Sequence, residues 1–319
     1  MEQQRVFRVG LLAVLMALVF RLAFLEIPQR VMDSQIENTS VTEKTGRNVR
    51  FSPFIEHFFP DFVETPVPSL PEATEPPIPS FFDEETAQLF NAAKVYPDTA
   101  ALLKQPLTWN LKTGEPAVLI LHTHATESYT KKGETYIESA SWRTLDEDYN
   151  MLSIGDRVAE LLEEEGIAVI HDRTLHDRPS YDGSYTAARK ALNQQLEENP
   201  SIVLVLDIHR DAAERSYGQL RTKAVVDGVR CAQLMMVVGT NHEAYEENLS
   251  IALKLHAQLE RQVPGITRPL QLRAARYNQD LSPGAIIVEV GAAGNTHPEA
   301  LRAADQLAQA VVALARGTN

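Results

Sequence analysis

The sequence predicts an α/β fold: a single mostly parallel or mixed sheet flanked by helices, preceded by a membrane anchor and a linker. Two observations carry this prediction. Short apolar runs rich in Val, Ile and Leu alternate with longer stretches of helical periodicity in the last two thirds of the chain. That alternation is typical of a parallel sheet with helices on its faces. With 319 residues and 44% apolar residues, the chain is long enough for one large domain plus appendages.

Short apolar runs mark the expected strands of the sheet. They are Ala117–Leu121, the run GIAVIHD ending at Asp172, Ser201–Asp207 and Ala285–Val290. Two further runs, Lys223–Val226 and Val229–Val238, flank the dipeptide Asp227-Gly228. This dipeptide between apolar runs predicts a β-hairpin with a two-residue turn.

Apolar residues at helical spacing predict four long helices between these strands. Their expected bounds are Tyr149–Gly166, Ser184–Glu198, Glu243–Val263 and Pro298–Arg316. Gly166 suits the end of the first helix, and Pro298 suits the first position of the last helix, where its missing N–H costs nothing.

The N-terminal segment has the pattern of a signal-anchor. Arg5 and Arg8 precede the apolar run Val9–Phe20, and Arg21 and further apolar residues follow. A retained single-pass anchor over residues 1–28 is the favoured interpretation, with a cleaved signal or a buried helix as the alternatives. The positive flank then leaves the rest of the chain outside the cytoplasm.

Residues 29–107 are predicted to form an extended linker, and residues 108–319 the globular domain. Eight of the 18 prolines fall between Pro53 and Pro79, where proline excludes a helix or a central strand. The phenylalanines in this linker predict either a docking segment for a partner or membrane, or a loop packed on its own domain.

Charge and cysteine content narrow the partners and the chemistry. The net charge of −13 argues against nucleic acid as a partner. Cys231 is the single cysteine, so an internal disulfide and a cysteine-rich zinc site are both excluded. Its apolar surroundings predict a buried structural thiol.

Ionisable side chains follow or interrupt three of the expected strands. His122, His124 and Glu127 come directly after the first, His209 follows Asp207, and Glu289 lies inside AIIVEV. Open α/β sheets build their sites outside the carboxyl ends of their strands. We therefore expect these side chains to share one site.

Imidazole and carboxylate groups together suit a catalytic zinc ion, which takes three protein ligands and leaves one position for water. The expected ligands are His124, Glu127 and His209. Glu289 is the expected general base, because a carboxyl group inside an apolar strand is otherwise costly to bury. An ion pair between Glu289 and Arg273 or Arg276 is the structural alternative.

Three points stay open in this ligand set. His122 and His124 lie two residues apart, so on a strand they would face the same way, and one of them would then orient a ligand. His171 and His176 flank a loop that can approach the site. Arg210 and Asp211, next to His209, either fix the loop or touch substrate.

Four ordered motifs from Pro116 to the C-terminus resemble the stage II sporulation protein P family. They are HTHATESY, LDIHRDA, VVGTN (Val237–Asn241) and YNQDLSPGAIIVEVGAAGNT (Tyr277–Thr296). The order of anchor, linker and catalytic domain also matches that family.

The resemblance implies a zinc-dependent N-acetylmuramoyl-L-alanine amidase with a wall-amidase or zinc-carboxypeptidase-like plan, acting in endospore engulfment. It implies a His–Glu–His zinc site at His124, Glu127 and His209, with Glu289 as the catalytic glutamate. His124 is preferred over His122 because its H-x-x-E spacing with Glu127 is also that of zinc carboxypeptidases.

The resemblance further implies glycan strands with stem peptides as substrate, stage II sporulation proteins D and M as partners, and a location at the septal membrane with the catalytic domain in the intermembrane space. Two other functions stay open. A zinc carboxypeptidase or endopeptidase would need a cation for a free carboxylate, with Arg210, Arg273 and Arg276 available. A wall-binding protein would keep the fold without turnover.

Overall fold

The computed structural model describes residues 89–107, 109–130, 142–215 and 218–316. The chain divides into two units, Met1–Pro68 and Ser69–Asn319, and all described residues belong to the second. The predicted anchor and most of the predicted linker lie outside the described residues. Within the described ranges, no helix has the length and apolar character needed to cross a membrane.

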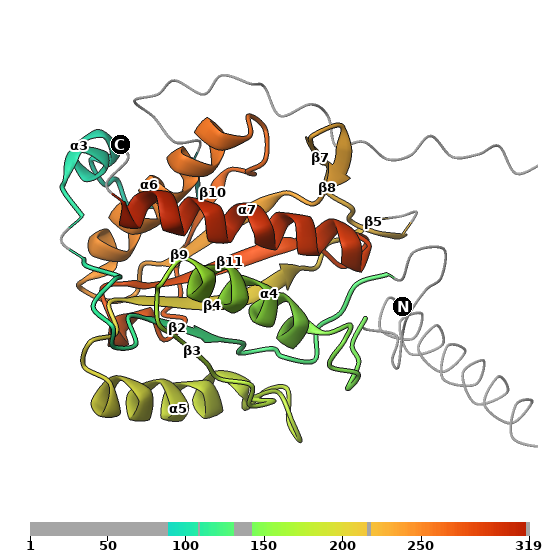
Figure 1. The fold of residues 1–319 in the computed structure, drawn as a ribbon, viewed down its shortest axis with the longest axis horizontal. Coiled ribbons are helices and arrows are strands. Elements are labelled where there is room, and N and C mark those ends of the chain that lie inside the picture. The colour runs from blue at the N-terminus through green and yellow to red at the C-terminus, as the bar shows by residue number, and fades with distance from the viewer. Residues whose placement is uncertain (1–88, 108, 131–141, 216–217, 317–319) are drawn as a thin grey trace, which may run out of the picture. The chain divides into compact units, whose positions relative to one another are not determined.

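A seven-stranded mixed sheet forms the centre of the described unit, which confirms the predicted α/β class (Figure 1). Its strands run in the order β1-β10-β9-β11-β4-β2-β3, and all neighbours are parallel except β9 and β11. The strands are β1 (Leu89–Asn91), β2 (Val118–Leu121), β3 (Val169–His171), β4 (Leu204–Asp211), β9 (Leu234–Gly239), β10 (Leu270–Arg273) and β11 (Ala285–Ala292).

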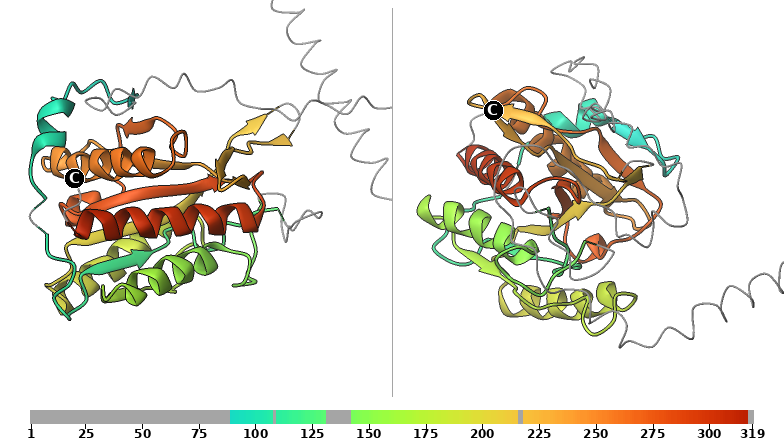
Figure 2. Two further views of the ribbon diagram at one scale, coloured as in Figure 1. Left: turned by 45° about the horizontal axis from the view of Figure 1, so that its top comes forward. Right: turned by 90° about the vertical axis from the view of Figure 1, so that its right-hand side faces the viewer.

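Helices cover both faces of the sheet, as Figures 1 and 2 show. The helices α4, α6 and α7 pack on one face, and α5 packs on the other against β2, β4 and β11. The helices are α3 (Thr99–Lys104), α4 (Met151–Glu164), α5 (Ser184–Glu198), α6 (Tyr245–Gln262) and α7 (His297–Ala315).

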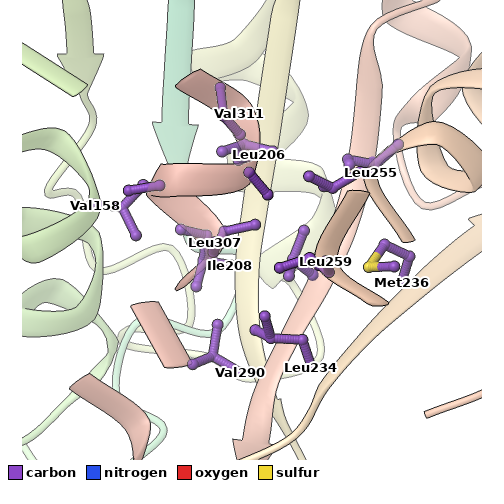
Figure 3. Close-up of a cluster of buried hydrophobic side chains, with 14 of the residues drawn as sticks. Val158, Leu206, Ile208, Leu234, Met236, Leu255, Leu259, Val290, Leu307 and Val311 are labelled. Atoms are coloured by element: carbon purple, nitrogen blue, oxygen red, sulfur yellow. The ribbon is translucent and has the colours of Figure 1, made fainter. Parts of the chain in front are cut away.

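The main core lies between the sheet and the face that α4, α6 and α7 cover. Leu206 and Ile208 of β4 project into it and meet Val158 of α4 and Leu307 of α7 (Figure 3). Side chains alternate along a strand, so Val205, Asp207 and His209 of β4 face the opposite side, towards α5. Strand alternation therefore separates the core from the face that carries the ionisable residues.

Local signals explain where the helices begin. The side chain of Asn150 accepts a hydrogen bond from Leu152 N and caps α4, and Thr296 and Glu299 form a reciprocal capping box on α7. Pro298 lies in the first turn of α7, but the helix begins one residue earlier, at His297. The bounds of α5 are the predicted ones.

The hairpin predicted at Asp227-Gly228 is present as β7 (Ala224–Val226) and β8 (Val229–Cys231), with positive φ at both turn residues. The prediction of a single strand over Val229–Val238 is wrong. Two strands, β8 and β9, occupy this run, and Ala232 and Gln233 separate them. A second short antiparallel pair joins β5 (Glu214–Arg215) and β6 (Gly218–Gln219).

Secondary structure also occurs before residue 108, the predicted start of the catalytic domain. Strand β1 pairs with β10, and the carbonyl of Leu102 in α3 accepts hydrogen bonds from Ser250 Oγ and Lys254 Nζ of α6. The predicted domain boundaries stay a prediction.

Candidate active site

The connections of β2 and β4 diverge at the carboxyl ends of these two parallel strands. From β2 the chain runs through α4 to β3 on one side, and from β4 it runs towards β9 on the other. Such a point in an open α/β sheet leaves a crevice beyond the strand ends. The predicted site residues are found here.

The three predicted metal ligands lie together in this region. His124 and Glu127 occupy the turn after β2, and His209 lies in β4. His209 Nδ1 is 3.6 Å from Glu127 Oε2, and the rings of His124 and His209 are perpendicular with centroids 5.3 Å apart. All three side chains are largely buried.

Glu289 lies beside His209, because the two residues are register partners on β11 and β4. Laterally adjacent residues of parallel strands face the same side of the sheet. Burial raises the pKa of Glu289 to about 8. Its Oε2 is shielded from solvent and has no hydrogen-bond partner among the described residues. Within the same residues, no ion pair joins it to Arg273 or Arg276, the structural alternative considered above.

Asp207 is a site residue that the sequence analysis did not single out. Its Oδ1 lies 2.9 Å from His209 Nε2, and its carboxylate accepts hydrogen bonds from the N–H and hydroxyl of Thr123. A carboxylate can only accept, so Nε2 of His209 carries the hydrogen and the ring is held with Nδ1 towards Glu127. The spacing Asp-x-His on a strand is the sequence signal, since it places both side chains on one face.

Positive neighbours keep Glu127 ionised. The main-chain N–H of Arg210 donates to Glu127 Oε2 at 3.3 Å, and Arg210 Nη1 lies 3.5 Å from Oε1. Burial alone would raise the pKa of Glu127, but Arg210 and His209 outweigh it and lower the pKa to about 2. Arg210 also donates to the carbonyls of Ser128 and Trp142, so it fixes this loop.

His122 lies away from His124 although only one residue separates them. Strand β2 ends at Leu121, and residues 123–126 form a turn that carries His124 away from the direction of the strand. His122 Nδ1 instead lies 2.9 Å from the carbonyl of Ile208, and its Nε2 lies 2.9 Å from His171 Nε2. Burial and the neighbouring His171 lower the pKa of His122 to about 3.

Gly155 of α4 makes room for this second pair of histidines. A Cβ atom at Gly155 would lie 2.5 Å or less from the Nε2 atoms of His122 and His171. His171 therefore approaches His122 rather than the three predicted ligands. His176 bonds Asp172 at 3.0 Å and, among the described residues, makes no hydrogen bond or ring contact with those ligands.

Two tyrosines from the region around the start of α5 contact His124. Tyr181 stacks on its ring at a centroid distance of 4.3 Å, and Tyr185 meets it edge-on at 5.6 Å. The guanidinium of Arg143 lies 4.2 Å from the ring centre of Tyr181, and its Nη2 is 3.7 Å from Glu127 Oε1. The sequence analysis missed both tyrosines, because only the folded chain brings α5 across from the turn after β2.

The imidazole nitrogens of His124 and His209 and the carboxylate oxygens of Glu127 are the types of donor atom that zinc binds. Buried His124 Nδ1 has no hydrogen-bond partner within the described residues, His209 presents Nδ1, and Glu127 presents an ionised carboxylate. Burial alone would lower the pKa of His209, but Asp207 and Glu127 raise it well above its usual value, so this cluster favours positive charge. In the described ranges, no three His, Cys, Asp or Glu side chains are grouped closely enough to hold a metal.

The fold and the site define an α/β protein whose imidazole and carboxyl groups gather at the carboxyl ends of β2 and β4. The family model "Stage II sporulation protein P (SpoIIP)" matches residues 37–312, and the chain belongs to this family. It is 30% identical over 254 residues to stage II sporulation protein P of Bacillus subtilis (strain 168). That match covers 75% of this chain and 61% of the length of the relative.

The solved structures that match this chain include two proteins described as amidases. One is the N-acetylmuramoyl-L-alanine amidase AmiC2 of Nostoc punctiforme, at 14% identity and a TM-score of 0.36 over 63% of this chain and 96% of that one. Another is the CwlD amidase of Clostridioides difficile, solved with the GerS lipoprotein, at 14% identity and a TM-score of 0.38 over 63% of this chain and 97% of that one.

Proposed function

We propose that this protein is a zinc-dependent N-acetylmuramoyl-L-alanine amidase that hydrolyses the muramic acid–L-alanine bond of peptidoglycan during sporulation. Membership of the stage II sporulation protein P family supports the sporulation role. The observation that carries the chemistry is the convergence of His124, Glu127 and His209 beside Glu289, from three separate segments of the sequence.

The site residues divide into ligands and supporting groups in this proposal. His124, Glu127 and His209 would hold the metal, and Asp207 fixes the orientation of His209 through its Nε2–H. A bound zinc ion lowers the pKa of water and polarises a carbonyl oxygen. Arg210 keeps the Glu127 carboxylate ionised and in place.

Glu289 moves the proton. Its Oε2 has no competing partner in the described part of the chain, so it is free to take a proton from the attacking water. It then returns that proton to the nitrogen of L-alanine as the amide bond breaks. A carboxyl group with a pKa near the working pH can both accept and release a proton, and burial moves the pKa of Glu289 in that direction.

The location and partners of the protein are also proposals. We expect residues 1–28 to anchor the chain in the cytoplasmic membrane, with the catalytic domain on the outer side of that membrane, in the space that forms at the sporulation septum. Stage II sporulation proteins D and M are the expected partners. Family membership supports these partners, and the basic flank of the apolar run supports the orientation.

A stem-peptide carboxypeptidase or endopeptidase is the runner-up. It needs a cation free to bind a substrate carboxylate, and Arg210 is committed to Glu127 and to two main-chain carbonyls. Arg210 is therefore not available to bind a substrate carboxylate, which leaves Arg273 and Arg276 as candidates and favours the amidase.

Fragment analysis of purified peptidoglycan separates these functions. The full chain in detergent, loaded with zinc, is incubated with peptidoglycan, and the soluble products are identified by mass spectrometry. The amidase releases stem peptides with a free L-alanine amino group, whereas a carboxypeptidase releases terminal amino acids from attached peptides. Intact peptidoglycan in the presence of the zinc-loaded protein would favour a binding protein.

A further inference from the structure

Tyr185 lies at the candidate site without a role in the mechanism above. It is in the first turn of α5, half-buried, with its ring perpendicular to His124 at a centroid distance of 5.6 Å. Its other aromatic neighbour is Tyr277, at 5.7 Å. The ring is thus held on two sides, and one of them is a predicted metal ligand.

The hydroxyl of Tyr185 is not used by the fold. Within the described residues, the side chain of Tyr185 makes no hydrogen bond. Its main-chain carbonyl accepts one from Asn278 Nδ2. A phenol can both donate and accept a hydrogen bond, so this O–H, which makes no hydrogen bond in the described part of the chain, is available to a bound substrate.

This hydroxyl also keeps its proton. Burial raises the pKa of Tyr185 well above its ordinary value, and the nearby carboxylates of Asp207, Glu289 and Glu127 raise it further. The ring contact with His124, whose ring in turn meets His209, places Tyr185 beside the predicted ligands. It is therefore a neutral hydrogen-bond donor at the site over the physiological pH range.

We propose that the Tyr185 hydroxyl is a catalytic hydrogen-bond donor, which binds the oxygen of the scissile carbonyl as that carbon becomes tetrahedral. The inference rests on the proposed amidase function and adds a residue to it. A donor already fixed in place stabilises the negative charge that develops on the oxygen. The proton stays on Tyr185, while Glu289 carries the transferred proton.

The matched tyrosine Tyr245 provides a control. It lies in the first turn of α6, and its hydroxyl contacts its own neighbour Glu246 at 3.3 Å. Replacing either tyrosine by phenylalanine removes one hydroxyl and leaves the ring. Of the two tyrosines, Tyr185 contacts a predicted metal ligand, whereas Tyr245 contacts Glu246.

The test compares Tyr185→Phe with Tyr245→Phe in the zinc-loaded full chain, using a soluble muramoyl-peptide substrate and a phosphinate analogue of the tetrahedral state. We expect Tyr185→Phe to lower kcat by about 10²- to 10³-fold. KM, zinc content and melting temperature should stay at wild-type values. The phosphinate should bind more weakly by a similar factor, because it resembles the tetrahedral state and the substrate does not.

Two results would overturn the inference separately from the proposed function. An active wild type with an equally active Tyr185→Phe variant removes only the role of Tyr185. Loss of activity accompanied by loss of zinc, or by a raised KM with kcat unchanged, shows that the ring environment or substrate binding was disturbed instead. An inactive wild type overturns the proposed function and this inference with it.

Discussion

His209 and Glu289 are register partners on the parallel strands β4 and β11, so their side chains emerge side by side on the face that α5 covers. This relationship links the metal-ligand set to the expected base through the backbone of the sheet. The separation of the two groups is therefore fixed by strand pairing rather than by a loop. Sites built on such elements hold their geometry more closely than sites built on loops.

Replacing Glu289 by glutamine should abolish turnover and keep the metal. Glutamine cannot accept the proton of the attacking water, so kcat should fall by about 10²- to 10⁴-fold. Burial disfavours the ionised carboxylate of Glu289, so its removal should not lower the melting temperature. Kinetics, zinc content and calorimetry of Glu289→Gln check these points, and a zinc-free variant would show that Glu289 is a ligand instead.

Replacing Asp207 by asparagine should weaken zinc binding. Asparagine no longer imposes the Nε2–H form of His209, and we expect the zinc dissociation constant to rise by about 10- to 100-fold. A competition titration with a zinc chelator measures this change. Asp305→Asn, at a surface ion pair with Arg157, is the matched control. Equal zinc affinity in both variants would argue that Asp207 has no part in the metal site.

Leu206 should be among the most costly core residues to truncate. It is fully buried between the sheet and the helices α4 and α7 (Figure 3). Leu206→Ala leaves a cavity there and should lower the free energy of unfolding by about 2–5 kcal/mol. Denaturant titration measures it, with Val225→Ala, at a side chain 52% exposed, as a control expected within about 0.5 kcal/mol.

His256 should make stability depend on pH below neutrality. Burial lowers its pKa to about 4, against an ordinary value of 6.5. The unfolded chain therefore binds one more proton than the folded chain between these values. The stabilising contribution is complete above about pH 6.5 and is lost as the pH falls towards 4, by up to about 3 kcal/mol.

Unfolding titrations at pH 7 and pH 5 on the wild type and His256→Gln isolate this effect. The variant cannot titrate, so the part of the pH dependence that belongs to His256 should disappear from it. An unchanged dependence in the variant would assign the loss of stability to other groups.

Much of the fold follows from local patterns in the sequence. The helix Ser184–Glu198, the strand starting at Ala285 and the hairpin at Asp227-Gly228 occur where periodicity and turn chemistry predict them. Strands β1 and β10 were missed because their residues, LFN and LQLR, do not form a continuous apolar run. Partners far away in sequence define them: β1 pairs with β10, and β10 with β9.

The candidate site shows the same division between local and long-range information. Spacing and residue type were sufficient to propose His124, Glu127, His209 and Glu289. The Asp-x-His spacing in β4 is a local signal for Asp207, but the hydrogen bond that Thr123 donates to it comes from another strand connection. The contact of Tyr185 with His124 depends on the placement of α5, which no local pattern shows. The different surroundings of His122 and His124 follow from the turn at residues 123–126 after β2. The apolar run Ala117–Leu121 predicted where the strand ends, but not the path of this turn.

The zinc affinity of His124→Ala compared with His122→Ala tests the central claim most directly. The structure places His124 beside His209 and Glu127, whereas His122 contacts His171 and the carbonyl of Ile208. We predict that His124→Ala weakens zinc binding by more than the roughly 100-fold loss typical of an outer hydrogen-bonding partner. His122→Ala should keep near wild-type affinity in its folded fraction. Zinc binding retained in His124→Ala and lost in His122→Ala would contradict the assignment.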